Sequence, residues 1–308
     1  MKTIAITGVL GYSGRYVAAE AVRRGWHVVG LTNSAGRLPN PAGYELRPMP
    51  WGTSENVLSG VDVLVNTYWV RFSYAGQRGG HAAFSHEQAV RHTLALFESA
   101  RQAGVGRVVH TSITCPDSES ELPYFRGKAE LEQALAATGL PHSVLRPAIL
   151  FGESPQESIL INNMAWCLRR LPAVATFGRG EYSLQPIHVQ DFAELAMDEA
   201  SRSEPQRIIN ATGRETYTFR ELWALLARSM GLWRPVLPVP HGVGYLAARV
   251  LGSLVGDVML TRDEIAGLAQ NRLAVPGSGG GTRPLSTWLQ QHADTLGRAY
   301  ASELSRRQ

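Results

Sequence analysis

The chain has 308 residues, of which 44% are hydrophobic and 18% are charged, which is enough apolar material for one large core or two lobes. Its formal net charge of +4 comes from scattered lysines and arginines. Because no basic stripe with interleaved aromatic residues is present, the sequence does not indicate nucleic-acid binding. With two cysteines, and nine histidines that lack metal-ligating spacing, it favours neither a disulfide framework nor a metal site.

The same features bear on the compartment. Scarce cysteines suit a reducing cytoplasm, and the first residues already have the pattern of a core strand instead of a secretory signal. The longest apolar tract, residues 243–260, is interrupted by Arg249 and Asp257. It therefore predicts an amphipathic helix, with a partner-facing role as one alternative, and not a membrane span.

Strand and helix patterns alternate through the first half of the chain, as a parallel sheet covered by helices requires. The predicted strands lie at residues 4–6, 26–32, 46–51, 61–66, 107–111 and 143–145. The predicted helices lie at residues 15–24, 54–58 and 85–103, and another begins near residue 124. This alternation predicts an α/β fold with a Rossmann-type, doubly wound parallel sheet over residues 1–150.

Beyond residue 152 the alternation loses its rhythm. Helices are predicted at residues 159–171, 191–200 and 286–303 and from residues 218 and 261, with extended segments at 182–189 and 207–211. Three pairs have the spacing of helix caps, namely Asp191 with Glu194, Thr218 with Glu221, and Thr261 with Glu264. We expect residues 151–308 to form a smaller, irregular substrate lobe, of which about 185–213 returns to the main sheet.

Three glycines follow the first strand at intervals of three residues. Gly8 lets the chain leave the strand sharply, Gly11 lets the backbone approach a pyrophosphate, and Gly14 lets the first helix pack closely against the strand. A second predicted strand completes a βαβ unit of the expected length, so the position of the glycines is stronger support than their spacing alone. The pattern predicts a dinucleotide-binding turn formed by Gly8, Gly11, Tyr12, Ser13 and Gly14.

The residues that follow the second strand bear on the choice of nucleotide. A carboxylate about twenty residues past the glycine turn would hold a ribose 2′-hydroxyl, but this position is Asn33, followed by Ser34 and Arg37. A neutral hydrogen-bonding pair with a guanidinium nearby suits a 2′-phosphate, so the sequence favours NADP(H) over NAD(H). The alternative is that Arg37 is a solvated loop charge.

Tyr124 and Lys128 are the catalytic candidates. Four residues apart on a predicted helix, they share one face, so the lysine ammonium can reach a ribose and the phenol together. A cation there lowers the pKa of the phenol, which can then exchange a proton with a carbonyl or alcohol. The pair follows a hydroxyl-rich turn, residues 111–114, which makes a chance occurrence less plausible than the spacing alone suggests.

These residues resemble the short-chain dehydrogenase/reductase superfamily in its extended or atypical branch. The resemblance rests on the Tyr124 to Lys128 pair and on the segments TGVLGYSG at 7–14, LRPAILFG at 145–152 and QPIHVQDFAELA at 185–196. More narrowly, NTYWVRF at 66–72, SITCP at 112–116 and PYFRGKAELE at 123–132 are similar to the subfamily of the NADPH-binding accessory subunit of mitochondrial complex I and its bacterial relatives.

The resemblance implies roles for individual residues. Tyr124 would be the acid/base and Lys128 its ribose-bound partner. The residues that would line the cofactor are Asn66, Thr67, Tyr68, Thr111, Ser112, Ile113, Pro147, Ala148, Ile149 and Leu150. The chain departs from the pattern at Ile113, where the superfamily has the hydroxyl that orients the carbonyl. Ser112 or Thr114 would take that role, and Thr114 is preferred.

The leading hypothesis is an NADP(H)-dependent reductase or dehydrogenase that transfers hydride to or from a carbonyl, alcohol or imine of a small molecule. Ile113 favours a second hypothesis, a non-catalytic NADPH-binding interaction or sensor protein, and an epimerase or dehydratase of the sugar-nucleotide type is a third. The helix at 84–103 and the tract at 243–260 are both candidate faces for a homodimer. The sequence does not identify the substrate.

Overall fold

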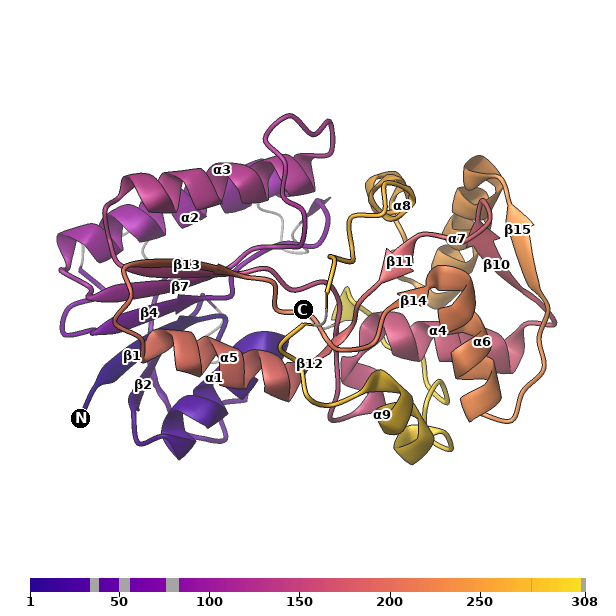
Figure 1. Ribbon diagram of the computed structural model, residues 1–308, viewed down its shortest axis with the longest axis horizontal. Helices are drawn as coiled ribbons and strands as arrows, with labels where there is room; N and C mark the ends of the chain where they lie inside the picture. Colours follow the sequence, from indigo (N-terminus) through magenta and orange to yellow (C-terminus); the bar gives the residue numbers. More distant parts are fainter. Residues whose placement is uncertain (34–38, 50–55, 76–82, 278, 306–308) are drawn as a thin grey trace. The chain divides into compact units, whose positions relative to one another are not determined.

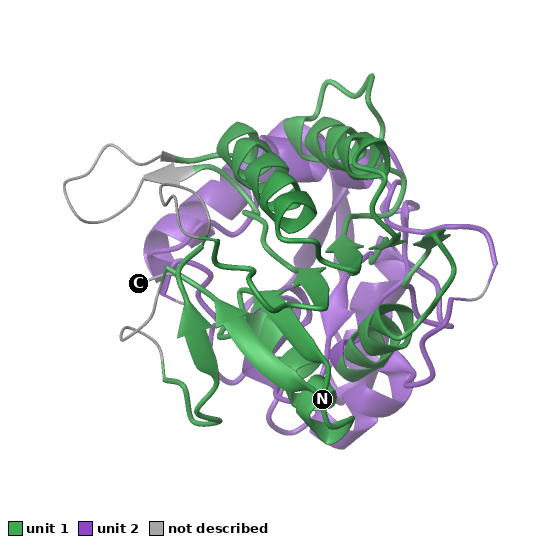
Figure 2. Cartoon of the chain, turned by 90° about the vertical axis from the view of Figure 1, so that its left-hand side faces the viewer, with its two compact units in different colours: residues 1–147, 190–211 green, residues 148–189, 212–308 purple. Residues whose placement is uncertain are grey.

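The computed structural model describes the chain except for residues 34–38, 50–55, 76–82, 278 and 306–308. The chain divides into two compact units (Figure 2). The first contains residues 1–147 and 190–211, and the second contains residues 148–189 and 212–308. Among the described residues, no helix is both long and apolar enough to cross a bilayer.

A seven-stranded sheet forms the centre of the first unit, in the order β13-β8-β7-β4-β1-β2-β3 (Figure 1). All its neighbouring strands are parallel. The strands are β1 (Thr3–Thr7), β2 (His27–Leu31), β3 (Glu45–Arg47), β4 (Val63–Asn66), β7 (Arg107–Thr111), β8 (His142–Leu145) and β13 (Gln206–Ile209). The predicted Rossmann-type sheet is confirmed. Its strand order reverses between β1 and β4, and in such sheets the crevice beyond the carboxyl ends at this point is where ligands bind.

Helices cover both faces of this sheet (Figure 1). On one face lie α2 (His86–Gln102) and α3 (Pro123–Ala137), and on the other lie α1 (Tyr12–Arg23) and α5 (Val189–Ala200). The strands bury Leu64, Val108 and Val144 against Leu96 of α2 and Leu131 of α3. Burial on both faces explains why these strands are continuous apolar runs in the sequence. Residues Tyr74–Ala75 (β5) and Ala83–Phe84 (β6) form a separate antiparallel pair.

The second unit contains three short strand pairs with helices around them. The paired strands are β9 (Leu150–Phe151) with β12 (Ile187–His188), β10 (Val174–Phe177) with β15 (Val236–Val239), and β11 (Ser183–Leu184) with β14 (Tyr217–Thr218). The helices are α4 (Ile159–Arg170), α6 (Phe219–Ser229), α7 (His241–Val255), α8 (Arg262–Ala269) and α9 (Leu285–His292), with a 3₁₀ turn at Pro155–Glu157. Its own core includes Phe151, Leu168, Trp223 and Leu289.

The capping predictions have mixed outcomes. Thr218 and Thr261 both form complete capping boxes with the glutamates three residues later. The prediction for Asp191 is wrong, because α5 already begins at Val189, directly after β12, and Asp191 is buried inside the helix.

Two predicted helices also differ from the structure. The terminal helix ends at His292 and not at residue 303, since the later chain is held by tertiary bonds: the buried Asp257 accepts from the main-chain N–H groups of Glu303 and Leu304. The helix predicted at 54–58 lies partly outside the described residues, and residues 57–60 form a turn.

Candidate active site

The glycine turn after β1 is crowded by its own backbone. Gly8 has a φ of 62°, the left-handed region that glycine tolerates best, and its carbonyl accepts from the N–H of Gly11 at 2.7 Å. A Cβ on Gly14 would lie 2.1 Å from the Gly8 carbonyl oxygen, and one on Gly11 would lie 3.0 Å from it. The turn therefore excludes a side chain at Gly14 and leaves little room for one at Gly11. Glycine is needed at position 14 because a side chain there would meet the turn. The sequence analysis predicted a different reason, close packing of the first helix against the strand.

Helix α1 starts directly at this turn. Its N-cap is Gly11, which has no side chain that could accept from the first helical turn. The first N–H groups of an α-helix have no partner within the helix, and they lie at the positive end of its dipole. Bare backbone and an uncapped helix start together fit the diphosphate of a dinucleotide.

A hydrogen-bond network joins the end of β1 to the end of β4. The hydroxyl of Thr7 donates to the side-chain oxygen of Asn66 at 2.8 Å and accepts from the N–H groups of Thr67 and Tyr68. The amide nitrogen of Asn66 lies 3.0 Å from Nδ1 of the buried His110. Asn66 is fully buried, so its side chain joins the carboxyl ends of β1 and β4, while the chain at Thr67 and Tyr68 is partly exposed.

The two candidates for the hydroxyl that orients the substrate, Ser112 and Thr114, lie in the turn after β7 and have different contacts. Ser112 donates to Glu132 at 2.5 Å, and the same carboxylate accepts two bonds from Arg146. The Ser112 hydroxyl is therefore engaged in a buried network. Thr114 is also buried and is anchored through its main chain, whose N–H donates to the Pro147 carbonyl. The preference for Thr114 stays a prediction.

Tyr124 and Lys128 lie on α3 beside aromatic residues from two other segments. The Lys128 ammonium nitrogen donates to the carbonyl of Thr111, the last residue of β7, at 2.7 Å and lies 4.1 Å from the ring centroid of Trp69. The edge of the Tyr124 ring meets Trp69, with 5.5 Å between centroids, and meets His86 at 5.4 Å. Trp69 and His86 stack on each other with nearly parallel rings. We call Trp69, His86, Tyr124 and Lys128 the aromatic–lysine cluster.

The sequence did not predict all of this cluster. Trp69 had one signal, its place in the NTYWVRF segment that resembles the complex I subfamily. His86 had no signal, because its place beside Tyr124 depends on the packing of α2 against α3. That packing is close, since a Cβ on Gly127 would lie 2.9 Å from a methyl carbon of Val90.

Burial determines the charge of Lys128. The side chain is almost completely buried, and this burial lowers its pKa to about 7, although the carboxylate of Glu132 opposes the shift. Near neutral pH the ammonium form and the neutral amine of Lys128 are therefore present in similar amounts. An added negative charge nearby would favour the charged form.

This pKa predicts a pH dependence of stability. An unfolded lysine keeps a pKa near 10.5, so between about pH 7 and 10 the unfolded chain binds more protons than the folded one. Stability then rises with pH through that window. Relative to Lys128→Met, we expect the cofactor-free wild type to gain about 2 kcal/mol of unfolding free energy between pH 7 and pH 9. Urea unfolding of both proteins at the two pH values measures this difference, and parallel profiles would contradict it.

The remaining predicted residues are distributed as follows. Asn33 is exposed, and its side-chain oxygen accepts from the N–H of Met49. Ser34 and Arg37 lie outside the described residues. Pro147 ends the first segment of the first unit. Ala148, Ile149 and Leu150 begin the second unit, where the Ile149 carbonyl accepts from the N–H of Ile187.

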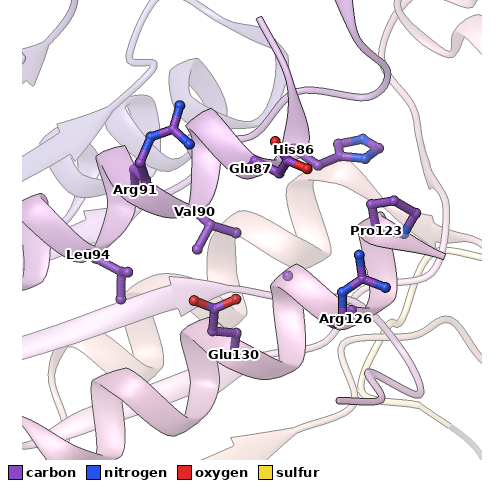
Figure 3. Close-up of a pocket in the computed structure, with 9 residues that line it drawn as sticks. His86, Glu87, Val90, Arg91, Leu94, Pro123, Arg126 and Glu130 are labelled. Carbon is purple, nitrogen blue, oxygen red and sulfur yellow. The ribbon is translucent and has the colours of Figure 1, made fainter. Parts of the chain in front are cut away.

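A pocket of about 240 Å³ lies between α2 and α3 (Figure 3). Its charged lining residues are Glu87, Arg91, Arg126 and Glu130. It borders the aromatic–lysine cluster at His86, but neither Tyr124 nor Lys128 lines it. Two arginines balance two glutamates, so the pocket has no charge preference of the kind a phosphate site needs. We do not assign the cofactor to it.

A doubly wound parallel sheet with a bare glycine turn at the reversal of its strand order defines an NAD(P)-binding fold. The family model described as the NAD dependent epimerase/dehydratase family matches residues 4–211, and the chain belongs to this family. The crystal structure of the Citrobacter sp. triphenylmethane reductase complexed with NADP(H) is similar, with a TM-score of 0.71 and 17% identity over 94% of this chain and 99% of that one.

Two curated relatives extend the comparison. An uncharacterised protein of Mycobacterium tuberculosis is 27% identical over 233 residues, which cover 74% of this chain and only 23% of that protein. The mitochondrial NADH-ubiquinone oxidoreductase 40 kDa subunit of Neurospora crassa is 24% identical over 278 residues, covering 85% of this chain and 69% of that subunit. The family match and the Neurospora relative confirm the resemblance that the sequence motifs predicted.

Proposed function

We propose that this protein is an NADP(H)-dependent reductase or dehydrogenase that transfers hydride to or from a carbonyl, alcohol or imine of a small molecule. The observation that carries the proposal is the aromatic–lysine cluster, in which Tyr124 and Lys128 lie beside the end of β7. This cluster belongs to the same unit as the glycine turn. Membership of the NAD-dependent epimerase/dehydratase family supports an enzyme.

The chain's residues fit a nicotinamide dinucleotide. Gly8, Gly11 and Gly14 would receive the diphosphate, because three glycines leave the backbone of the turn bare. The turn is too crowded by its own backbone to take a side chain at Gly14. Two buried polar atoms near Lys128, the Thr111 hydroxyl and the Trp69 indole nitrogen, have no hydrogen-bond partner in the described part of the chain. Unsatisfied buried polar atoms are uncommon in proteins, which supports a polar ligand at this place. When bound, the nicotinamide supplies or accepts the hydride.

The protein's own groups handle the proton. In the reducing direction Tyr124 donates its phenolic proton to the substrate oxygen or nitrogen as hydride arrives at carbon. The ammonium form of Lys128 stabilises the phenolate that remains and so lowers the pKa of the phenol. A negatively charged dinucleotide would shift the Lys128 equilibrium toward that ammonium form. Thr114 is proposed to orient the substrate, and the second unit is proposed to bind the rest of it.

A panel assay tests this function. Purified protein is incubated with NADPH and a series of ketones, quinones and imines while the absorbance of the reduced nicotinamide is followed. Consumption of NADPH that depends on one substrate class supports the proposal. Tight NADPH binding without turnover of any compound would contradict it.

The choice of NADP(H) has its own test. Because the Arg37 guanidinium is proposed to pair with the 2′-phosphate, Arg37→Ala should weaken NADPH binding by about tenfold or more and leave NADH binding unchanged. Fluorescence titration with both nucleotides measures this. Arg272→Ala, which removes an arginine from the second unit, is the control. An equal loss of affinity for NADPH and NADH would show that Arg37 does not bind the 2′-phosphate.

Ile113 favours a second candidate, a protein that binds NADPH without catalysis. It occupies the position of the orienting hydroxyl, and the neighbouring Ser112 hydroxyl is engaged with Glu132.

A third candidate, an epimerase or dehydratase, follows from the breadth of the family. It would retain the nucleotide through purification and show no net oxidation of NADPH. We further propose a cytoplasmic location, which the small number of cysteines supports.

A further inference from the structure

Helix α7 presents an apolar stripe to solvent. Val243, Leu246, Val250 and Leu254 are exposed by 55%, 61%, 55% and 77%. At 100° per residue these four positions occupy an arc of roughly 80°, so they form one continuous row along the helix. Surface helices of globular proteins normally turn such a row toward the core. We call these four residues the α7 stripe.

The opposite side of α7 explains why the stripe faces outward. The buried residues of the helix are Gly244 and Gly252. A Cβ on Gly244 would lie 2.5 Å from the Phe177 ring of β10, and one on Gly252 would lie 2.6 Å from the Asp257 carbonyl oxygen. Only glycine fits these contacts, so the helix is docked through its small residues. Rotating the stripe inward would drive leucines into space that does not admit a methyl group.

Helix α7 itself carries a positive charge and no acidic residue. Residues 222–256 contain three arginines and no acidic residue. Arg249 lies on α7 next to the stripe and is exposed. The segment that leads into α7 has the exposed side chains of Trp233 (83%), before β15, and Leu237 (49%), in β15. An apolar row with an exposed arginine beside it is the combination found on helices that lie in a membrane interface.

We propose that α7 lies in the plane of an anionic phospholipid surface, with the α7 stripe inserted among the acyl chains and Arg249 at the headgroups. With 15 residues the helix is too short to span a bilayer, so it binds on one leaflet. A second copy of this chain fits less well, because α7 carries Arg249 and no acidic residue, so two copies of the helix would bring like charges together. Anionic lipid supplies the opposite charge.

Vesicle flotation tests the proposal. The full chain is mixed with vesicles of phosphatidylcholine and phosphatidylglycerol in equal parts, or of phosphatidylcholine alone. We expect binding to the mixed vesicles that weakens as salt is raised, and little binding to the neutral ones. Leu246→Gln with Leu254→Gln should reduce the vesicle partition coefficient by about tenfold or more. Arg249→Gln should reduce binding to the mixed vesicles only.

The matched control removes apolar surface elsewhere. Val22 and Ile208 in the first unit are exposed by 52% and 59%, so Val22→Gln with Ile208→Gln should bind vesicles like the wild type. Circular dichroism melting confirms that each variant is folded. Absence of wild-type flotation, or equal flotation of the α7 variant, would overturn the proposal. So would a wild-type dimer in sedimentation equilibrium that the α7 variant loses, because the stripe would then be covered by a second copy.

Discussion

Tyr124→Phe is expected to lower turnover by about two to four orders of magnitude while NADPH binding stays close to that of the wild type. The substitution removes only the hydroxyl, and the contacts of the ring with Trp69 and His86 are between ring faces and edges, which phenylalanine preserves. The expected loss is therefore in kcat and not in folding or cofactor affinity. Initial rates with the substrate class found in the panel assay, with NADPH titration alongside, measure both quantities.

The control for this variant is Tyr44→Phe, which removes a partly buried hydroxyl from the same unit at a position outside the proposed site. It should leave kcat unchanged. If Tyr124→Phe also turns over at the wild-type rate, Tyr124 has no part in the proton transfer. A loss of NADPH binding equal to the loss of rate would instead make Tyr124 a binding residue, which contradicts its role as acid/base.

Gly14→Ala is expected to lower NADPH affinity by about tenfold or more and the free energy of unfolding by about 1–3 kcal/mol. The new methyl group would be placed 2.1 Å from the Gly8 carbonyl oxygen, a backbone atom that can move only if the turn opens. An opened turn no longer presents the uncapped start of α1 to the diphosphate in the same way. Isothermal titration with NADPH and urea unfolding test the two parts separately.

Gly242→Ala is the matched control, because a Cβ at Gly242, in the first turn of α7, would meet nothing within 4 Å. In a helix, alanine in place of glycine is stabilising by up to about 1 kcal/mol. This variant should be at least as stable as the wild type and should bind NADPH normally. If Gly14→Ala is destabilised but binds NADPH with wild-type affinity, the diphosphate does not lie against this turn.

Local spacing predicted the glycine turn and the helix that carries Tyr124 and Lys128, because both depend on residues close together in the chain. The intervals between the glycines specify a turn that needs bare backbone. Tyr124 and Lys128 are four positions apart in the sequence, so they lie on the same face of an α-helix. The capping boxes at Thr218 and Thr261 were predictable for the same reason, since each joins residues three positions apart. The capping prediction at Asp191 was wrong because a neighbouring strand ran directly into the helix.

The hydrogen-bond partners of the site residues could not be predicted from local spacing. Ser112 is tied to Glu132, twenty positions along the chain, and Glu132 in turn to Arg146. Asn66 is engaged with Thr7 and His110 on the two flanking strands. Whether a hydroxyl or amide faces a ligand or a neighbour depends on such long-range pairings, and spacing in the sequence carries no information about them.

By itself, the sequence determined the seven strands of the central sheet, the glycine turn and the pairing of a tyrosine with a lysine, because each depends on residues close together in the chain. Only the tertiary structure decided the burial that lowers the Lys128 pKa and the outward direction of the α7 stripe. A row of leucines and valines opposite two glycines is compatible with either face inward. The space left beside Phe177 admits only the glycines, and this steric limit sets which face meets solvent.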